Sequence, residues 1–351
     1  MLKIKKLGLT FDDVLLIPKK TSLVSRSHVD LSTNLTPKIK LDIPLITANM
    51  DTVTESNMAI AIAKIGGIGI IHRFLTIKEE VDEVKTVKKN HYLVGAAIGI
   101  NSDYLERTEA LIKAGADVIV IDIAHGHSDH LLKVLRELVK KFPKKEFIAG
   151  NVATAEGAFD LAKHGAAAVK VGIGPGALCT TRIISGAGVP QLTAIDECSQ
   201  AVKKFKIPII ADGGIRTSGD ITKALAAGAS TIMIGTLFAG CDESPALTFF
   251  KNNRKYKLTR GMASLTANRD RQIKDKKVQK DLKNYAAEGV EAIVPYRGSV
   301  NDLVYQLING VRSGFSYNGS KNINELWEKA EFVQITQSSL IESNPHDVEV
   351  I

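Results

Sequence analysis

The feature that most constrains the fold is a repeat of short apolar segments between residues 44 and 236. Each segment has the length and the β-branched content of a buried strand, without the polar and apolar alternation of a half-exposed strand. Amphipathic stretches of helical period separate the segments. The eight segments are 44–50, 67–71, 92–98, 117–124, 146–152, 167–173, 208–213 and 230–236.

The clearest helical stretch is 128–142, in which Leu131, Leu135, Leu138 and Phe142 share one face. Glycine flanked by small residues or histidine precedes several strand-like segments, and glycine suits the left-handed cap that ends a helix. Eight strand–helix units predict a TIM (β/α)8 barrel, a fold of about 250 residues. A doubly wound open sheet is the alternative, because alternation alone does not prove closure.

The repeat leaves residues at both ends of the 351-residue chain. We expect one barrel domain over 1–351, with its core at about 43–251 and an irregular N-terminal arm before it. After the core we expect a mobile flap at about 259–298 and a C-terminal extension at 299–351. Within that extension, 300–312 and 323–330 have helical patterns.

Composition excludes several classes of protein. The chain is 44% hydrophobic and 24% charged, which excludes a disordered chain, and no apolar run reaches the roughly 20 residues of a membrane span. Its three cysteines cannot all pair, and the N-terminus lacks the apolar core of a secretory signal, so we expect a cytoplasmic protein. The net charge of +8 favours anionic ligands. The basic stretch 269–283 has no aromatic residue for base stacking, so we expect no nucleic-acid partner.

Active sites of such barrels lie at the carboxyl ends of the strands. Glycine-bearing turns follow the seventh and eighth strands, and such turns commonly bind a phosphate through backbone N–H groups. The alternative is that these glycines only permit tight turns. The polar residues and turns at the strand ends are Asn49, Arg73, Asp122, Asn151, Asp212, Gly213, Gly214, Gly235 and Thr236.

The loop after the sixth strand carries the best candidate nucleophile. Cys179 follows Gly174-Pro175-Gly176 and precedes two threonines and an arginine, whose hydroxyl groups and charge can activate a thiol. We expect Cys198, on a helix, and Cys241 to be buried and inert.

A second reading of the strand ends is a metal site. His125, His127 and His130 follow the fourth strand closely. A metallohydrolase barrel needs further ligands on other strands, so a solvated turn at a helix start is the preferred interpretation.

Several segments together resemble the IMP dehydrogenase/GMP reductase family, and the resemblance covers nearly the whole chain. The most specific is the cysteine loop, GIGPGALCTTR at 172–182. The others are LTFDDV at 9–14, ANMDTV at 48–53, ADGGIR at 211–216, RGM at 260–262, EG at 288–289 and PHDV at 345–348.

The resemblance implies a purine nucleotide oxidoreductase in which Cys179 attacks C2 of the base and a nicotinamide cofactor exchanges hydride at that carbon. It implies a homotetramer, whose 342–344 segment completes a K⁺ site in the neighbouring subunit. The implied residue roles are catalysis by Cys179, Thr181 and Glu288; substrate binding by Asp212, Gly214, Gly235, Thr236, Arg260, Met262 and Ala263; cofactor binding by Arg73, Asp122 and Asn151; and K⁺ binding by the carbonyls of Gly174, Gly176 and Cys179.

Departures from the dehydrogenase pattern favour a GMP reductase, which uses NADPH to convert GMP to IMP and ammonia. Residues 74–91 leave no room for the regulatory modules of cystathionine-β-synthase type that most dehydrogenases insert there. In the flap sequence after Met262, no Tyr directly follows an Arg, whereas dehydrogenases use an Arg-Tyr pair to activate water.

Other features keep an NAD-dependent IMP dehydrogenase as the alternative. The 289–291 and 342–348 segments look like dehydrogenases, and Arg271 is a candidate for a shifted base. Ala177 and Thr259 replace a usual Ser and Tyr near the phosphate, which weakens the implied phosphate site and favours neither branch. A non-catalytic nucleotide-binding barrel is the remaining hypothesis.

Overall fold

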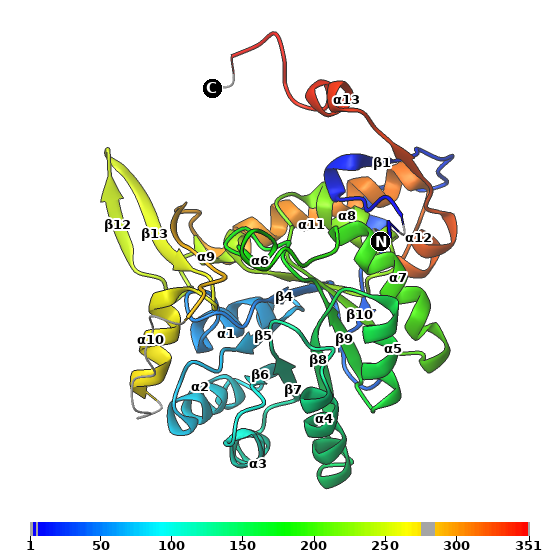
Figure 1. Cartoon of the computed structure of the whole chain (residues 1–351). Helices are drawn as coiled ribbons and strands as arrows, with labels where there is room; N and C mark the ends of the chain where they lie inside the picture. Colours follow the sequence, from blue (N-terminus) through cyan, green and yellow to red (C-terminus); the bar gives the residue numbers. More distant parts are fainter. Residues whose placement is uncertain (1–2, 5, 275–284, 350–351) are drawn as a thin grey trace.

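The computed structural model describes residues 3–4, 6–274 and 285–349, and eight parallel strands form a closed barrel at its centre (Figure 1). β11 (Thr231–Ile234) pairs with β4 (Leu45–Thr47) and closes the ring. The predicted TIM barrel is therefore confirmed, and the open sheet is wrong. The remaining strands around the ring are β5 (Ile68–Ile71), β6 (Val94–Ile98), β7 (Val118–Asp122), β8 (Glu146–Val152), β9 (Ala168–Val171) and β10 (Ile209–Asp212).

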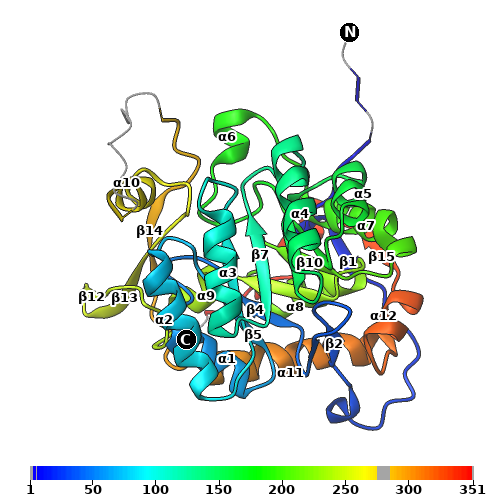
Figure 2. The same ribbon diagram turned by 90° about the horizontal axis from the view of Figure 1, so that it is seen from below.

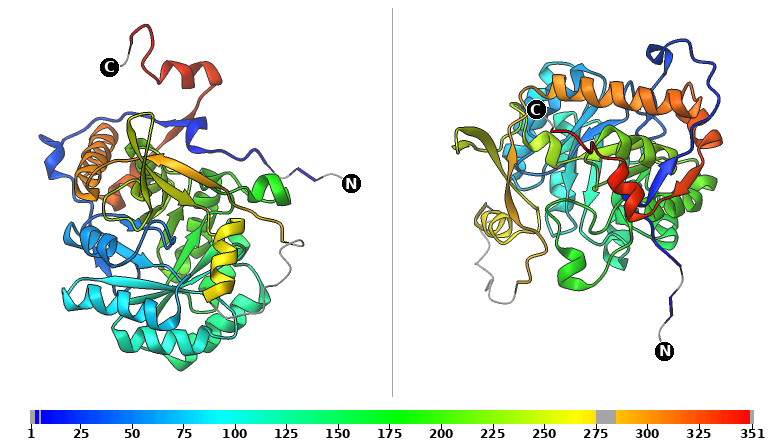
Figure 3. Two further views of the ribbon diagram at one scale, coloured as in Figure 1. Left: turned by 90° about the vertical axis from the view of Figure 1, so that its left-hand side faces the viewer. Right: turned by 90° about the horizontal axis from the view of Figure 1, so that it is seen from above.

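Helices surround the barrel. α11 (Val300–Asn318) packs against both α8 and α1, so a helix from the C-terminal segment completes the ring after β11 (Figure 3). The short α9 (Thr236–Ala239) and α6 (Thr181–Ser185) follow β11 and β9 at the strand ends. The other helices of the ring are α1 (Ser56–Lys64), α2 (Ile77–Lys89), α3 (Tyr104–Ala114), α4 (Asp129–Lys141), α5 (Ala155–Lys163), α7 (Gln191–Val202) and α8 (Ser218–Ala226).

Local capping chemistry sets several helix boundaries. The Ser128 hydroxyl accepts a hydrogen bond from the backbone N–H of Leu131 and starts α4, and Thr76 forms a capping box with Glu79 at the start of α2. Gly115 ends α3 with φ of 100°, a conformation that L side chains rarely adopt. Such caps fix where a helix begins or ends, so only a short loop is needed between the helix and the neighbouring strand.

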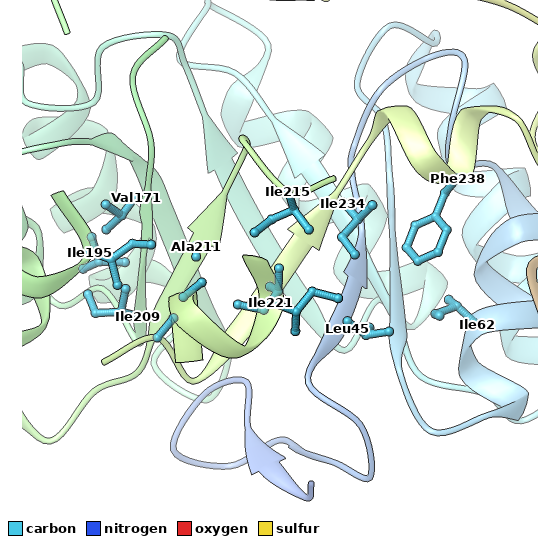
Figure 4. Packing of buried hydrophobic residues seen from close by; sticks show 14 of the residues in the cluster. Leu45, Ile62, Val171, Ile195, Ile209, Ala211, Ile215, Ile221, Ile234 and Phe238 are labelled. Atoms are coloured by element: carbon cyan, nitrogen blue, oxygen red, sulfur yellow. The ribbon is translucent and has the colours of Figure 1, made fainter. Parts of the chain in front are cut away.

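Two apolar layers hold the barrel together. The outer layer lies between strands and helices, where Leu45 and Ile234 pack near Ile62 of α1 and Phe238 of α9 (Figure 4). The inner layer fills the barrel with side chains from alternate strand positions, including Ile46. Both layers lie below the carboxyl ends of the strands, which leaves those ends available for polar groups.

The N-terminal arm contains more structure than the sequence analysis predicted. The hairpin of β2 (Thr33–Asn34) and β3 (Lys40–Leu41) places Leu35 and Leu41 in the inner layer, so the arm closes the amino end of the barrel. β1 (Val14–Leu16) pairs with β15 (Phe332–Gln334) of the C-terminal segment. Three short 3-10 helices are η1 (Phe11–Asp13), η2 (Arg26–His28) and η3 (Lys203–Phe205).

The expected flap is built on an antiparallel sheet at one side of the barrel, distant from α5 and α7 (Figure 2). Residues 275–284 of that flap lie outside the described residues, and its predicted mobility stays a prediction. In the described residues, no helix is both long and apolar enough to cross a membrane. The elements of this region and the C-terminal segment are β12 (Thr248–Lys251), β13 (Arg254–Arg260), α10 (Leu265–Lys274), β14 (Glu291–Pro295), α12 (Ile323–Lys329) and α13 (Gln337–Glu342).

Candidate active site

A cavity of about 360 Å³ lies at the carboxyl ends of the barrel strands. Its volume is in the range of small-molecule sites. The residues that the sequence analysis proposed for the site line this cavity, except Arg260, Arg271 and the 342–344 segment. These residues are Arg73, Asp122, Asn151, Gly174, Gly176, Cys179, Thr181, Asp212, Gly214, Gly235, Thr236, Met262, Ala263 and Glu288.

The cysteine loop is fixed against the segment that returns from the flap. The backbone N–H of Cys179 donates to the Gly176 carbonyl at 3.0 Å, and the N–H of Thr180 donates to the Glu288 carbonyl at 2.9 Å. The N–H of Val290 donates to the Leu178 carbonyl at 3.0 Å. Two chain segments more than a hundred residues apart are therefore held together at the partly exposed thiol.

A chain of side-chain hydrogen bonds runs from the thiol to a carboxylate. The Cys179 thiol donates to the Thr181 hydroxyl at 3.1 Å, and this hydroxyl donates to Oε2 of Glu288 at 2.8 Å. The hydroxyl both accepts and donates, as a proton relay requires. A proton leaving the sulfur can thus reach Glu288 through one side chain, which is how a nucleophile and its base are coupled.

The other two cysteines are unlike Cys179. Cys198 and Cys241 are fully buried, and burial raises the pKa of each thiol to about 12. Since the thiolate is the reactive form, both are unreactive at neutral pH, as the sequence analysis predicted.

The floor of the cavity is a polar network on four neighbouring strands. Nζ of Lys170, on β9, lies 2.7 Å from Asp122 Oδ1 and 2.6 Å from Asp212 Oδ2, and it also donates to Asn151 Oδ1. Nδ2 of Asn151 donates to Asp212 Oδ2 at 2.9 Å and to the Gly172 carbonyl at 2.8 Å. The sequence analysis did not predict this network, because Lys170 lies within an apolar segment. A single lysine in a strand that is otherwise apolar could have indicated a buried ion pair.

Charges in this network keep Asp122 ionised. Burial alone raises the pKa of its carboxyl, but Lys170 and Arg73 outweigh burial and hold the pKa below its ordinary value. Burial likewise lowers the pKa of Lys170, but Asp122 and Asp212 outweigh it, so that pKa is raised. The lysine is therefore a cation, and it faces at least one carboxylate anion.

A glycine beside this network allows two backbone segments to approach closely. Gly172 has φ of 153°, and a Cβ there would lie 2.0 Å from the backbone oxygen of Asp212, so only glycine fits. Arg216 also lines the cavity, and its guanidinium is held by Asp12 of the N-terminal arm at 2.5 and 2.9 Å. Sequence reasoning did not identify either member of this pair.

Arg260 is not among the residues that line the cavity. Its guanidinium donates to Asp51, in the loop after β4, and to Asp270 on α10, at 2.6 and 2.7 Å. The side chain thereby ties the flap helix to the barrel. Substrate binding by Arg260 stays a prediction, and the contacts observed for it are structural.

Arg73 lies at the side of the cavity near Asp122. Burial lowers the pKa of its guanidinium, and the charge of Asp122 opposes that effect. Its Nε is buried without a hydrogen-bond partner in the part of the chain that the structure describes. An unpaired buried donor beside a cavity fits an incoming ligand with acceptor oxygens.

Two of the three clustered histidines have contacts with different partners. His127 lies 2.9 Å from Asp160 and His130 lies 2.9 Å from the Ile100 carbonyl. Over residues 3–4, 6–274 and 285–349, no group of three or more His, Cys, Asp or Glu side chains could hold a metal ion.

Comparison with known proteins places this site in a family. Residues 8–346 match the IMP dehydrogenase/GMP reductase domain. The chain belongs to this family. It is 41% identical to an inosine-5'-monophosphate dehydrogenase of Nitrosopumilus maritimus, covering 98% of this chain and 99% of that protein. It is 44% identical to an inosine-5'-monophosphate dehydrogenase of Cryptosporidium parvum, covering 98% and 96%.

A similar solved structure is that of a GMP reductase. The chain superimposes with a TM-score of 0.93 on a GMP reductase of Trypanosoma brucei in complex with guanosine 5'-monophosphate, at 32% identity and 98% coverage of both chains. Family membership makes this protein an oxidoreductase of purine metabolism that binds nucleotides such as GMP or IMP and uses a nicotinamide cofactor. It does not decide between the two activities.

Chain length does not decide between the branches of the family either. Between β5 and β6 this chain has only α2, with no inserted domain. The alignment to the N. maritimus dehydrogenase spans 470 positions and that to the C. parvum dehydrogenase 391, against 351 residues here. Similar dehydrogenases therefore differ widely in length, and the choice depends on the residues of the site.

Proposed function

We propose that the protein is an NADPH-dependent GMP reductase that works through a covalent adduct of Cys179. The observation that carries this proposal is the hydrogen-bonded chain from Cys179 through Thr181 to Glu288 at the cavity. Such a chain can supply a proton to a departing amine. The proposal is supported by the flap sequence, in which no Tyr directly follows an Arg after Met262.

The proposed reaction converts GMP, NADPH and two protons into IMP, ammonium and NADP⁺. The sulfur of Cys179 bonds to C2 of the base, and its proton passes through Thr181 to Glu288. The same path returns a proton to the amino group as the bond from C2 to nitrogen breaks. A nicotinamide held by Asp122, Asn151 and Arg73 would supply the hydride that C2 gains. The bond from C2 to the sulfur of Cys179 would then break to release IMP, and the thiolate would take up a proton to restore the thiol; the other proton converts ammonia to ammonium.

Binding roles follow from the lining of the cavity. We propose that Asp212 holds ribose hydroxyls, that Gly214, Gly235 and Thr236 hold the phosphate, and that backbone groups of Met262 and Ala263 contact the base. The cofactor would contact Asp122, Asn151 and Arg73, and the buried unpaired Nε of Arg73 fits that role. K⁺ on the carbonyls of Gly174, Gly176 and Cys179, and a homotetramer, stay predictions.

The second candidate is an NAD-dependent IMP dehydrogenase, which converts IMP, NAD⁺ and water into XMP, NADH and a proton. The sequence relatives described above favour it, since both are dehydrogenases. Water activation would need a base at the adduct. Arg271, the candidate base, lies 5.6 Å from the Phe74 ring and does not line the main cavity. This position supports the reductase.

Paired assays test the proposal. The purified protein should consume the absorbance of NADPH when GMP is added, and release ammonia in equal amount. Formation of NADH from IMP and NAD⁺, with no NADPH consumption, would establish the dehydrogenase instead. Cys179→Ala should abolish whichever activity is found, and an unchanged rate would support a non-catalytic barrel.

A further inference from the structure

Lys170 is an unusual residue for its position. Its side chain is 2% exposed, on a strand whose neighbours Val169 and Val171 pack in the outer apolar layer. Ala168, two residues earlier, lies in the inner layer. Because side chains alternate along a strand, Lys170 points into the barrel, where an apolar residue would fill the space without loss of hydration.

The ammonium group uses all three of its donors on the strand ends. Asp122 of β7, Asn151 of β8 and Asp212 of β10 each place one side-chain oxygen on Nζ. In the order of the ring, these strands and β9 are four consecutive strands. The Lys170 side chain therefore connects side chains on three other strands at the carboxyl ends of the barrel.

The two carboxylates face different parts of the cavity. Each keeps 20% of its side chain exposed, although Nζ between them is buried. The hydrogen bonds from Lys170 and Asn151 occupy Oδ2 of Asp212 and leave Oδ1 for a ligand hydroxyl. Asp122 lies near Arg73, whose positive charge lowers the pKa of the Asp122 carboxyl.

A buried ion pair of this kind is a weak source of stability. Replacing one by apolar residues is often neutral or stabilising, whereas removing one partner leaves an uncompensated charge. The network lines the cavity, and its two carboxylates are partly exposed there. We therefore attribute the network to ligand binding rather than to the stability of the fold.

We propose that Lys170 is a positioning residue that sets the two carboxylates for two ligands at once, Asp212 for the ribose of the substrate and Asp122 for the ribose of the cofactor. The inference rests on the proposed binding roles of these two residues. It is independent of whether the reaction runs as a reductase or as a dehydrogenase.

The proposal predicts a signature in the steady-state constants. Asp212→Asn should raise mainly the KM of the nucleotide, and Asp122→Asn mainly the KM of the cofactor. Lys170→Met should raise both together, each at least about tenfold, since each carboxylate loses a charge-assisted hydrogen bond of about 1.5–3 kcal/mol. Lys170→Gln keeps two N–H donors and should lie between wild type and Lys170→Met.

Lys257→Met is the matched control. Lys257 is also buried, at 3% exposed, but its ammonium group donates to backbone carbonyls of 241–244, away from the cavity. It should lower the melting temperature and leave both KM values at their wild-type level.

Chemical rescue separates positioning from folding. Added ethylamine should restore activity to Lys170→Ala in a concentration-dependent way and should not affect Lys257→Ala. The substrates are whichever pair the wild type turns over, so failure of the reductase proposal leaves this test intact. The inference is overturned if folded Lys170→Met or Lys170→Gln keeps both KM values, or if only one of them rises.

Discussion

Thr181→Val tests the proton path most directly. Valine matches threonine in shape but lacks the hydroxyl, so the substitution breaks both bonds of the chain, at 3.1 Å to Cys179 and 2.8 Å to Glu288. A hydrogen bond to a charged group contributes about 1.5–3 kcal/mol, which corresponds to a factor of about 10–150 in rate. Loss of general acid–base catalysis itself costs a factor of about 10²–10⁴.

We therefore expect kcat for NADPH oxidation by GMP to fall by about 10²-fold or more, with little change in the KM of GMP. Thr180→Val is the matched control, because Thr180 precedes α6 without a side-chain hydrogen bond to the helix. Its kcat should stay near that of the wild type. An unchanged kcat in Thr181→Val, or an equal loss in both variants, would refute the relay.

Three further predictions follow from burial and charge. Iodoacetamide should modify Cys179 alone, as peptide mass mapping will show, because the two buried thiols have pKa values near 12. Gly172→Ala should lower the melting temperature and the activity, since a Cβ there meets the Asp212 backbone at 2.0 Å and a strained residue costs about 1–3 kcal/mol. Asp122 has a folded-state pKa below its ordinary value of 3.8, so its ionised form stabilises the protein above about pH 4, and that stability is lost as the pH falls through the lowered value. The difference in unfolding free energy between wild type and Asp122→Asn should be constant from about pH 5 to 9 and shrink only in acid; titration of this difference near neutrality would contradict the pairing with Lys170.

The sequence predicts the barrel well because periodicity reports directly on burial. The eight apolar segments each contain a strand, and the glycine after α3 ends it as expected. The β2–β3 hairpin is harder to predict, because strands of two residues carry no periodicity. Its role as the base of the barrel depends on contacts with distant residues.

Some residues of the site can likewise be predicted from the sequence, and others cannot. Cys179 and Asp212 are predictable because barrel chemistry concentrates at strand ends. Lys170 is not, since its partners lie on other strands and an isolated lysine carries no spacing signal. Arg260 is a further case: its motif predicts a substrate contact, but its charge is met by two carboxylates, one of them on the flap helix.

That flap contact bears on the chemistry. The fate of a covalent adduct depends on which group reaches C2 while the adduct exists. Arg260 ties α10 to Asp51 through Asp270, and Arg271 of the same helix lies against Phe74, so in the described part of the flap neither arginine lines the cavity. Thr181 and Glu288 do line it, and their side chains are hydrogen-bonded to each other. In the proposed reductase reaction, the group that reaches the adduct is therefore the Thr181–Glu288 pair, which would protonate the departing amine.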